Sequence, residues 1–114
     1  MPLIKLQTSV KIQDKASLVL EFSKICAQII GKPETYVQSI VEDDAVISMG
    51  GRIIDSAFVE VKSIGGLNPS VNKELSSALC RVLEEKIKVK PASVYINFIE
   101  VAASSWGNNS TTFG

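Results

Sequence analysis

The chain has 114 residues, which suits a single compact domain with a hydrophobic core, and we expect that domain to span residues 1–114. Lys+Arg and Asp+Glu number 12 each, and the resulting net charge of zero argues against nucleic acid or an anionic membrane as the main partner. The chain contains no histidine, which removes the commonest metal ligand and every Ser-His or Cys-His catalytic pair. Acid–base chemistry would therefore come from carboxylates, lysines, tyrosines or a terminal amine.

No apolar run is long enough to cross a bilayer, and the N-terminal residues lack the pattern of a secretory signal. We therefore expect a cytoplasmic protein. The two cysteines, Cys26 and Cys80, lie far apart among apolar residues at helical spacing, which predicts two buried, reduced thiols.

The first half of the chain predicts a strand, a helix and a second strand. Residues 3–8 show the alternation of a strand. Asp14 then has the place of a helix N-cap, and Gly31 follows the last apolar position, where a terminating glycine belongs. Pro33 prevents the helix from continuing. The remaining elements of this half are a strand at 36–42, a turn at 43–44 and a short return strand at 46–49.

The second half repeats this plan. Asn68 and Pro69 form an N-cap with proline at the first helical position, and an apolar stripe follows at helical spacing. Pro91 ends this helix. Strands are predicted on both sides of it, at 54–63 and at 94–101.

The two halves, about residues 1–50 and 51–105, carry a Lys-Pro pair at the same place, Lys32-Pro33 and Lys90-Pro91, between a helix and a strand. We interpret them as internal β-α-β repeats, which predict an α+β fold with a four-stranded mixed sheet and two helices on one face. The other face would then lie uncovered, although strand 94–101 is apolar on both sides. A closed homo-oligomer would bury that face and pair the edge strands.

Pro2 is the first candidate for chemistry, because an initiator methionine before a small residue is commonly removed. A freed proline is a secondary amine, and apolar surroundings would lower its pKa and make it a base near neutral pH. Taken alone, a proline at this position is more simply explained as a feature of stability or processing.

Lys32 is either a surface lysine favoured by the helix dipole or a cation that holds a substrate carboxylate or enolate oxygen. The segment Ser63-Ile64-Gly65-Gly66 could present backbone N–H groups to an anion, although Gly-Gly before an N-cap is also ordinary turn chemistry. Other candidates are side chains that usually belong to cores or interfaces: Tyr36, Tyr95, Asn97, Trp106 and Phe113.

In this order, five segments of the chain resemble the macrophage migration inhibitory factor family: Met1-Pro2, Gly31-Lys32-Pro33 with Tyr36, Ser63-Ile64-Gly65, Val94-Tyr95-Ile96-Asn97, and Trp106-Gly107-Asn108-Asn109-Ser110-Thr111. The likeness runs along essentially the whole chain. It implies the tautomerase fold, a homotrimer with sites between neighbouring subunits, and no metal or organic cofactor. It also implies a keto–enol tautomerase that acts on small arylpyruvates such as phenylpyruvate, or on dopachrome analogues.

The resemblance also implies a role for each matching residue. Pro2 matches the catalytic residue that carries the proton. Lys32 and the backbone N–H of Ile64 match the groups that hold the carboxylate and carbonyl end of the substrate. The remaining matches are pocket residues from the adjacent subunit, Tyr95 and Asn97, and an aromatic wall, Tyr36, Trp106 and Phe113.

The chain departs from this family at Ser56-Ala57-Phe58-Val59, where the animal proteins have a Cys-x-x-Cys motif, so we expect no thiol oxidoreductase activity. The tail around 104–112 also differs by small insertions and deletions. Two other hypotheses remain: a cytokine-like or host-modulating binding protein with a vestigial pocket, and a structural trimer without a small-molecule role. The joint presence of Pro2, Lys32, Ile64 and Asn97 favours the enzyme.

Overall fold

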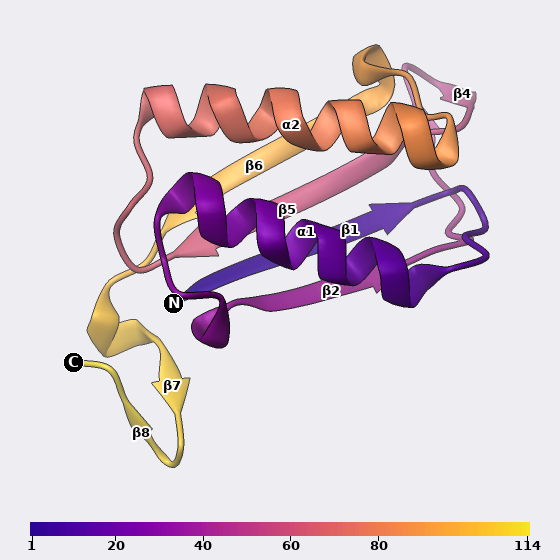
Figure 1. The fold of residues 1–114 in the computed structure, drawn as a ribbon. Helices are drawn as coiled ribbons and strands as arrows, with labels where there is room; N and C mark the ends of the chain where they lie inside the picture. The colour runs from indigo at the N-terminus through magenta and orange to yellow at the C-terminus, as the bar shows by residue number, and fades with distance from the viewer.

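A computed structural model describes residues 1–114 and shows one four-stranded sheet with both long helices packed on the same face (Figure 1). This confirms the predicted α+β architecture. The strands are β1 (Pro2–Thr8), β2 (Gln38–Glu42), β5 (Ala57–Ser63) and β6 (Val94–Glu100), and the helices are α1 (Lys15–Ile30) and α2 (Pro69–Ile87).

The sheet has the strand order β2-β1-β5-β6. β1 and β2 are parallel, as are β5 and β6, so each β-α-β repeat forms one half of the sheet. The two halves meet where β1 and β5 run antiparallel, with Pro2 opposite Ser63 and Thr8 opposite Ala57. The two repeats therefore begin at opposite ends of the sheet.

The predicted N-caps are present in both helices. In α1, the Oδ1 atom of Asp14 accepts a hydrogen bond from the backbone N–H of Ser17 at 3.0 Å. In α2, the Oδ1 atom of Asn68 accepts one from the backbone N–H of Val71 at 2.9 Å. Each bond satisfies a backbone donor that has no partner within its helix. The first turn of each helix is therefore fixed by a local sequence signal.

The two helices end differently. Gly31 ends α1 in the left-handed region, with φ 78°, as predicted. Lys88 ends α2 in the same region, with φ 61°, although a side chain there costs about 1 kcal/mol relative to glycine. α2 thus stops before Pro91, which instead begins the short 3₁₀ helix η2 (Pro91–Ser93).

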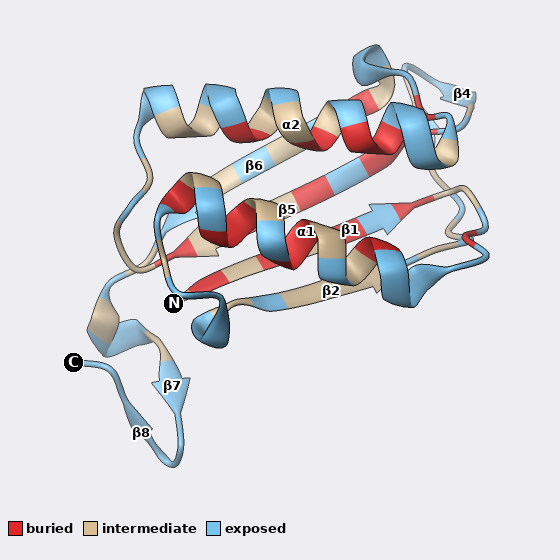
Figure 2. Ribbon diagram, viewed as in Figure 1, coloured by how far each residue is buried: buried red, intermediate tan, exposed pale blue.

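The core lies between the sheet and the helices, and Figure 2 shows the buried residues on the surfaces that face each other. Fully buried aliphatic and aromatic side chains from both layers fill it: Ile4, Leu6, Val59 and Val61 from the sheet, and Phe22, Leu75, Leu79 and Leu83 from the helices. The opposite face of the sheet is uncovered in the single chain, with Phe58, Tyr95 and Ile99 exposed by 38%, 65% and 41%.

Three boundaries differ from the sequence prediction. The strand predicted at 36–42 begins at Gln38, because η1 (Glu34–Tyr36) is a turn of 3₁₀ helix. The predicted return strand forms a separate hairpin, in which β3 (Ser48–Met49) pairs with β4 (Arg52–Ile53). Gly50 and Gly51 both have positive φ, which a tight two-residue hairpin turn requires. Residues 54–56, which were predicted to begin the next strand, therefore connect this hairpin to β5, and β5 begins at Ala57.

The C-terminal segment leaves the sheet after β6. It forms η3 (Ala103–Ser105) and a small hairpin of β7 (Gly107–Asn108) and β8 (Thr111–Thr112). In Figure 1 this hairpin lies at the end of the sheet where the chain begins. No helix of the structure combines the length and the apolar character that crossing a membrane would need.

Candidate active site

One end of the sheet brings together the chain start, the beginning of β2 and the loop after β5. Pro2 lies opposite Ser63 in the β1–β5 pair, and Leu3 lies opposite Gln38 in the β1–β2 pair. The ring of Pro2 is fully buried. Strand register therefore places Pro2 beside two segments that are remote from it in sequence.

A cavity of about 350 Å³ opens beside Pro2. It brings together four of the predicted site residues, Pro2, Tyr36, Trp106 and Phe113, from three separate segments. The backbone N–H of Phe113 donates to the carbonyl of Trp106 at 3.1 Å, which fixes the two aromatic residues relative to each other. The lining consists of Met1 and Pro2, Thr35 to Gln38, and Trp106, Gly107, Asn108 and Phe113.

Gln38 was not among the predicted site residues. It is the first residue of β2 and lies against the cavity because it pairs with Leu3, next to Pro2. The sequence offers one signal for it, its position two residues after Tyr36. Asn108 contributes a second amide from the tail segment.

Lys32 does not line this cavity, but packs against the glycines that follow β5. A Cβ built on Gly65 would lie 3.8 Å from the Lys32 Nζ, and one built on Gly66 would lie 3.2 Å from its Cε. The loop is also fixed from within, because the buried Ser63 hydroxyl donates to the carbonyl of Gly65 at 2.6 Å. Two residues without side chains thus let the Lys32 ammonium approach the loop that contains Ile64.

The amino terminus lies in the electrostatic field of these groups. Its pKa is lowered from the usual value, first by burial and then by the Lys32 ammonium, while Cys26 acts in the opposite direction. With Met1 in place, the nitrogen of Pro2 is a tertiary amide and has no basic lone pair. A base at this position therefore requires Pro2 itself to be the terminal residue.

Neither cysteine is arranged as a nucleophile. Burial raises the pKa of the Cys26 thiol to about 12, so this group is protonated at neutral pH. Cys80 is half-buried rather than buried as predicted, and burial and Glu84 also raise its pKa. Both thiols are free, and no group of three or more Cys, Asp or Glu side chains is placed to hold a metal ion.

Tyr95 and Asn97 lie away from Pro2 in the same chain. Tyr95 pairs with Phe58, whereas Ser63, the partner of Pro2, pairs with Glu100. Five residues of strand separate these rows, which corresponds to about 16 Å. Both side chains project from the uncovered face of the sheet, so a single chain does not assemble all eight predicted site residues.

The whole chain, residues 1–114, matches the family model described as "Macrophage migration inhibitory factor (MIF)". A homologue from Trichinella spiralis is 34% identical over 114 residues, covering 99% of this chain and 100% of that protein. A homologue from Brugia malayi is 32% identical over 115 residues and covers 100% of both chains. The crystal structure of a homologue from Prochlorococcus marinus has a TM-score of 0.94 at 37% identity, covering 98% of this chain and 99% of that one.

The four-stranded mixed sheet, its two helices and the buried Pro2 define a protein of the tautomerase superfamily. Within that class, the chain belongs to the macrophage migration inhibitory factor family.

Proposed function

We propose that this protein is a cofactor-free keto–enol tautomerase of arylpyruvates such as phenylpyruvate, with Pro2 as the acid–base catalyst once Met1 has been removed. The observation that carries this proposal is the position of Pro2, whose buried ring borders a cavity walled by Tyr36, Trp106 and Phe113. Aromatic walls suit the phenyl ring of such a substrate. A dopachrome analogue would use the same walls.

The surroundings of the amino terminus support a neutral amine at physiological pH. Burial and the Lys32 ammonium lower the pKa of the terminal amine of Met1, and the amine of a trimmed Pro2 would lie within the same surroundings. A neutral amine can take a proton from the carbon next to the keto group, and the resulting ammonium can return it to the enolate oxygen. The same groups run the reaction in reverse.

Lys32 and the loop after β5 would bind the acidic end of the substrate. The Lys32 ammonium supplies positive charge, and the backbone N–H of Ile64 can donate to the oxygen on which charge develops. The approach of Lys32 to Gly65 and Gly66 supports this pairing of a cation with backbone donors.

The proposal includes a homotrimer whose neighbouring subunit completes the site. The uncovered sheet face carries exposed Tyr95 and Ile99, and Tyr95 lies too far from Pro2 of its own chain to share its cavity. A neighbouring copy would cover this face and bring its Tyr95 and Asn97 to the site. Sedimentation equilibrium should give a trimer, and a fully active monomer would contradict this part of the proposal.

Pro2→Gly tests the catalytic role directly, because glycine keeps a terminal amine and loses the secondary amine on its rigid ring. We expect the kcat/KM for phenylpyruvate, followed by ultraviolet absorbance, to fall by about 100-fold or more in a variant of verified N-terminal mass. The trimer should remain intact. Unchanged kcat/KM would refute catalysis by Pro2 and would favour a binding role for the cavity.

A further inference from the structure

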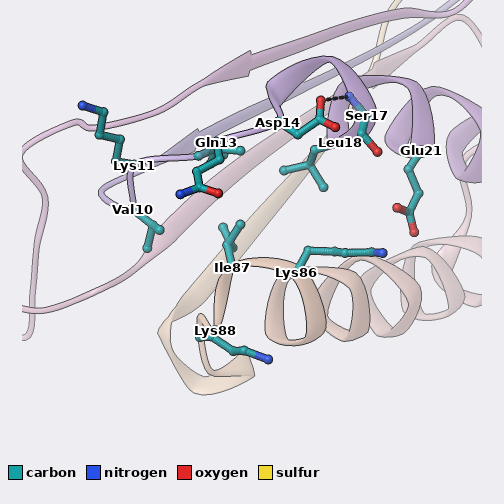
Figure 3. Close-up of a pocket in the computed structure, with 11 residues that line it drawn as sticks. Val10, Lys11, Gln13, Asp14, Ser17, Leu18, Glu21, Lys86, Ile87 and Lys88 are labelled. Carbon is teal, nitrogen blue, oxygen red and sulfur yellow. Dashed lines mark hydrogen bonds between the residues drawn. The ribbon is translucent and has the colours of Figure 1, made fainter.

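A second hollow lies at the end of the sheet opposite Pro2, where β1 leads into α1 and where α2 ends (Figure 3). Its volume is about 470 Å³, within the range of small-molecule sites. It shares no residue with the cavity beside Pro2. Its possible role is therefore independent of the tautomerase proposed above.

The hollow has an apolar floor. Ile12 and Leu18 are buried beneath it, while Val10 and Ile87 remain partly accessible at its sides. These four side chains come from the loop after β1, from α1 and from the end of α2. A ligand placed here would bury an apolar group against them.

Glu21 and Lys86 carry unpaired charges at the opening, and the Asp14 carboxylate, which caps α1 through Oδ1, lies beside them. Glu21 extends from α1 and Lys86 from α2, and in Figure 3 the charged ends of both lie at the same side of the hollow. The two ion pairs of the structure involve other residues, and neither Glu21 nor Lys86 forms a side-chain hydrogen bond. Both charges are thus available to a ligand.

The other lysines around the hollow are less available. The Lys88 ammonium donates to the carbonyl of Glu85 at 3.2 Å. Lys11 points away from the hollow in Figure 3. The opening therefore offers charges of both signs rather than a cluster of cations, which favours a ligand that carries both signs over a simple anion.

The wall of the hollow is held by hydrogen bonds within the chain. The backbone N–H of Ile12 donates to Asp43 Oδ2 at 2.8 Å, and that of Asp44 donates to the carbonyl of Val10 at 3.2 Å. The Ile12 bond is also the main reason that the pKa of Asp43 is lowered, so this anchor stays ionised at neutral pH. A site fixed in this way needs little ordering when a ligand binds.

We propose that this hollow binds a free apolar α-amino acid such as leucine. Its carboxylate meets Lys86, its ammonium meets Glu21, and its side chain packs on Leu18 of the floor between Val10 and Ile87. An arylpyruvate has no cationic group and leaves Glu21 unpaired, so the substrate of the proposed enzyme is a poor ligand here.

Titration of the ¹⁵N-labelled full chain with L-leucine tests this proposal. We expect saturable amide shifts confined to residues 10–21 and 83–89, with the Pro2 cavity unaffected. 4-Methylpentanoate, which lacks the ammonium, and isopentylamine, which lacks the carboxylate, should each bind roughly fivefold more weakly or worse, since each loses one ion pair. The absence of shifts up to roughly 20 mM leucine would overturn the proposal.

Matched variants assign the two charges. Glu21→Gln and Lys86→Gln should each weaken leucine binding roughly fivefold, whereas Lys73→Gln, on an exposed part of α2, should leave it unchanged. Phenylpyruvate turnover should be the same in all three variants. Equal leucine affinity in the wild type and in both pocket variants would overturn the assignment, as would equally tight binding of 4-methylpentanoate.

Discussion

The two repeats begin in corresponding ways at opposite ends of the sheet, yet only one of these ends carries the candidate active site. β1 begins at Pro2 and faces Ser63 at the end of β5, while β5 begins at Ala57 and faces Thr8 at the end of β1. Both first residues are buried. Ala57, however, follows Ser56 in mid-chain, so its backbone nitrogen is an amide. Removal of Met1 turns the backbone nitrogen of Pro2 into an amine. The repeat supplies two equivalent positions, and only the one next to the chain terminus can hold a base.

The lysines at the two helix–strand junctions also differ, in their burial and in their contacts with the neighbouring loop. Lys32 is half-buried and approaches Gly65 and Gly66, whereas Lys90 is exposed. The loop that follows β5 has glycines where the loop that follows β1 has residues with side chains, such as Val10. Of the two junction lysines, only Lys32 therefore lies close to the loop that follows a strand.

The largest effect on stability should come from Gly66→Ala, because this substitution closes that approach. The new Cβ would lie 2.8 Å from Ile30 Cγ2 at a residue with φ 83°. Strain and overpacking together should lower the free energy of unfolding by about 2–3 kcal/mol, measured by urea denaturation.

Gly51→Ala is the matched control for Gly66→Ala. Gly51 has φ 75°, but no other atom lies within 4 Å of the place that an added Cβ would take, so only backbone strain of about 1 kcal/mol is expected. An equal decrease in the free energy of unfolding in the two variants would show that the Lys32 side of the loop is not tightly packed.

Lys32→Ala should chiefly weaken substrate binding. We expect the KM for phenylpyruvate to rise roughly tenfold, since one charge-assisted contact is lost. Lys90→Ala removes the lysine at the corresponding junction and should change neither KM nor kcat. An unaltered KM in Lys32→Ala would mean that Lys32 is only a surface lysine.

The same Lys32→Ala variant should change the pH dependence of the reaction. The Lys32 ammonium lowers the pKa of the amino terminus, so its removal should raise that pKa. A base must be deprotonated to act, and kcat/KM falls as the pH drops through its pKa. The acid limb of the pH profile should therefore move to higher pH. A shift to lower pH, or an unchanged limb, would separate Lys32 from the amine.

Smaller effects are expected where the two helices begin. Asp14→Ala and Asn68→Ala each remove one N-cap acceptor and should each cost about 1 kcal/mol of stability. Urea denaturation would measure both. A much larger loss for Asp14→Ala than for Asn68→Ala would indicate that the start of α1 also holds the neighbouring loop in place.

The smallest effect concerns the end of α2, which is compared with the end of α1. Lys88→Gly should relieve left-handed strain and stabilise the chain by at most about 1 kcal/mol, offset in part by loss of the bond to Glu85. Gly31→Ala should destabilise it by about 1 kcal/mol, because Gly31 has φ 78°. Thermal unfolding of the two variants should shift in opposite directions, and shifts of the same sign would contradict the comparison.

Local signals in the sequence were sufficient for much of the fold. Asp14, Gly31, and Asn68 followed by Pro69 were predicted as helix ends because caps depend on hydrogen bonds between near neighbours in the chain. A short strand at 46–49 was predicted too, but its partner was not. Pairing depends on the competing strand, and Ser48–Met49 joins Arg52–Ile53 rather than β2.

The candidate site was less accessible to local reasoning. The proximity of Pro2 to Tyr36 depends on the register of β1 against β2, and its proximity to Trp106 depends on the path of the C-terminal hairpin. Neither proximity can be predicted from the spacing of residues that are close in the sequence. The resemblance to a family, rather than periodicity or spacing, assigned these residues to one site. The same resemblance implied that Tyr95 comes from an adjacent subunit, and the strand register shows that Tyr95 and Pro2 of one chain lie apart.

The most direct test of the account compares two forms of the same chain, one trimmed to Pro2 and one that retains Met1, each identified by its N-terminal mass. The fold should be the same in both, whereas the trimmed form loses Met1 from the cavity lining and has a secondary amine where the other form has the amide nitrogen of Pro2. The enol–keto conversion of phenylpyruvate should have a kcat/KM at least about 100-fold higher in the trimmed form. Equal values in the two forms would contradict catalysis by the terminal proline.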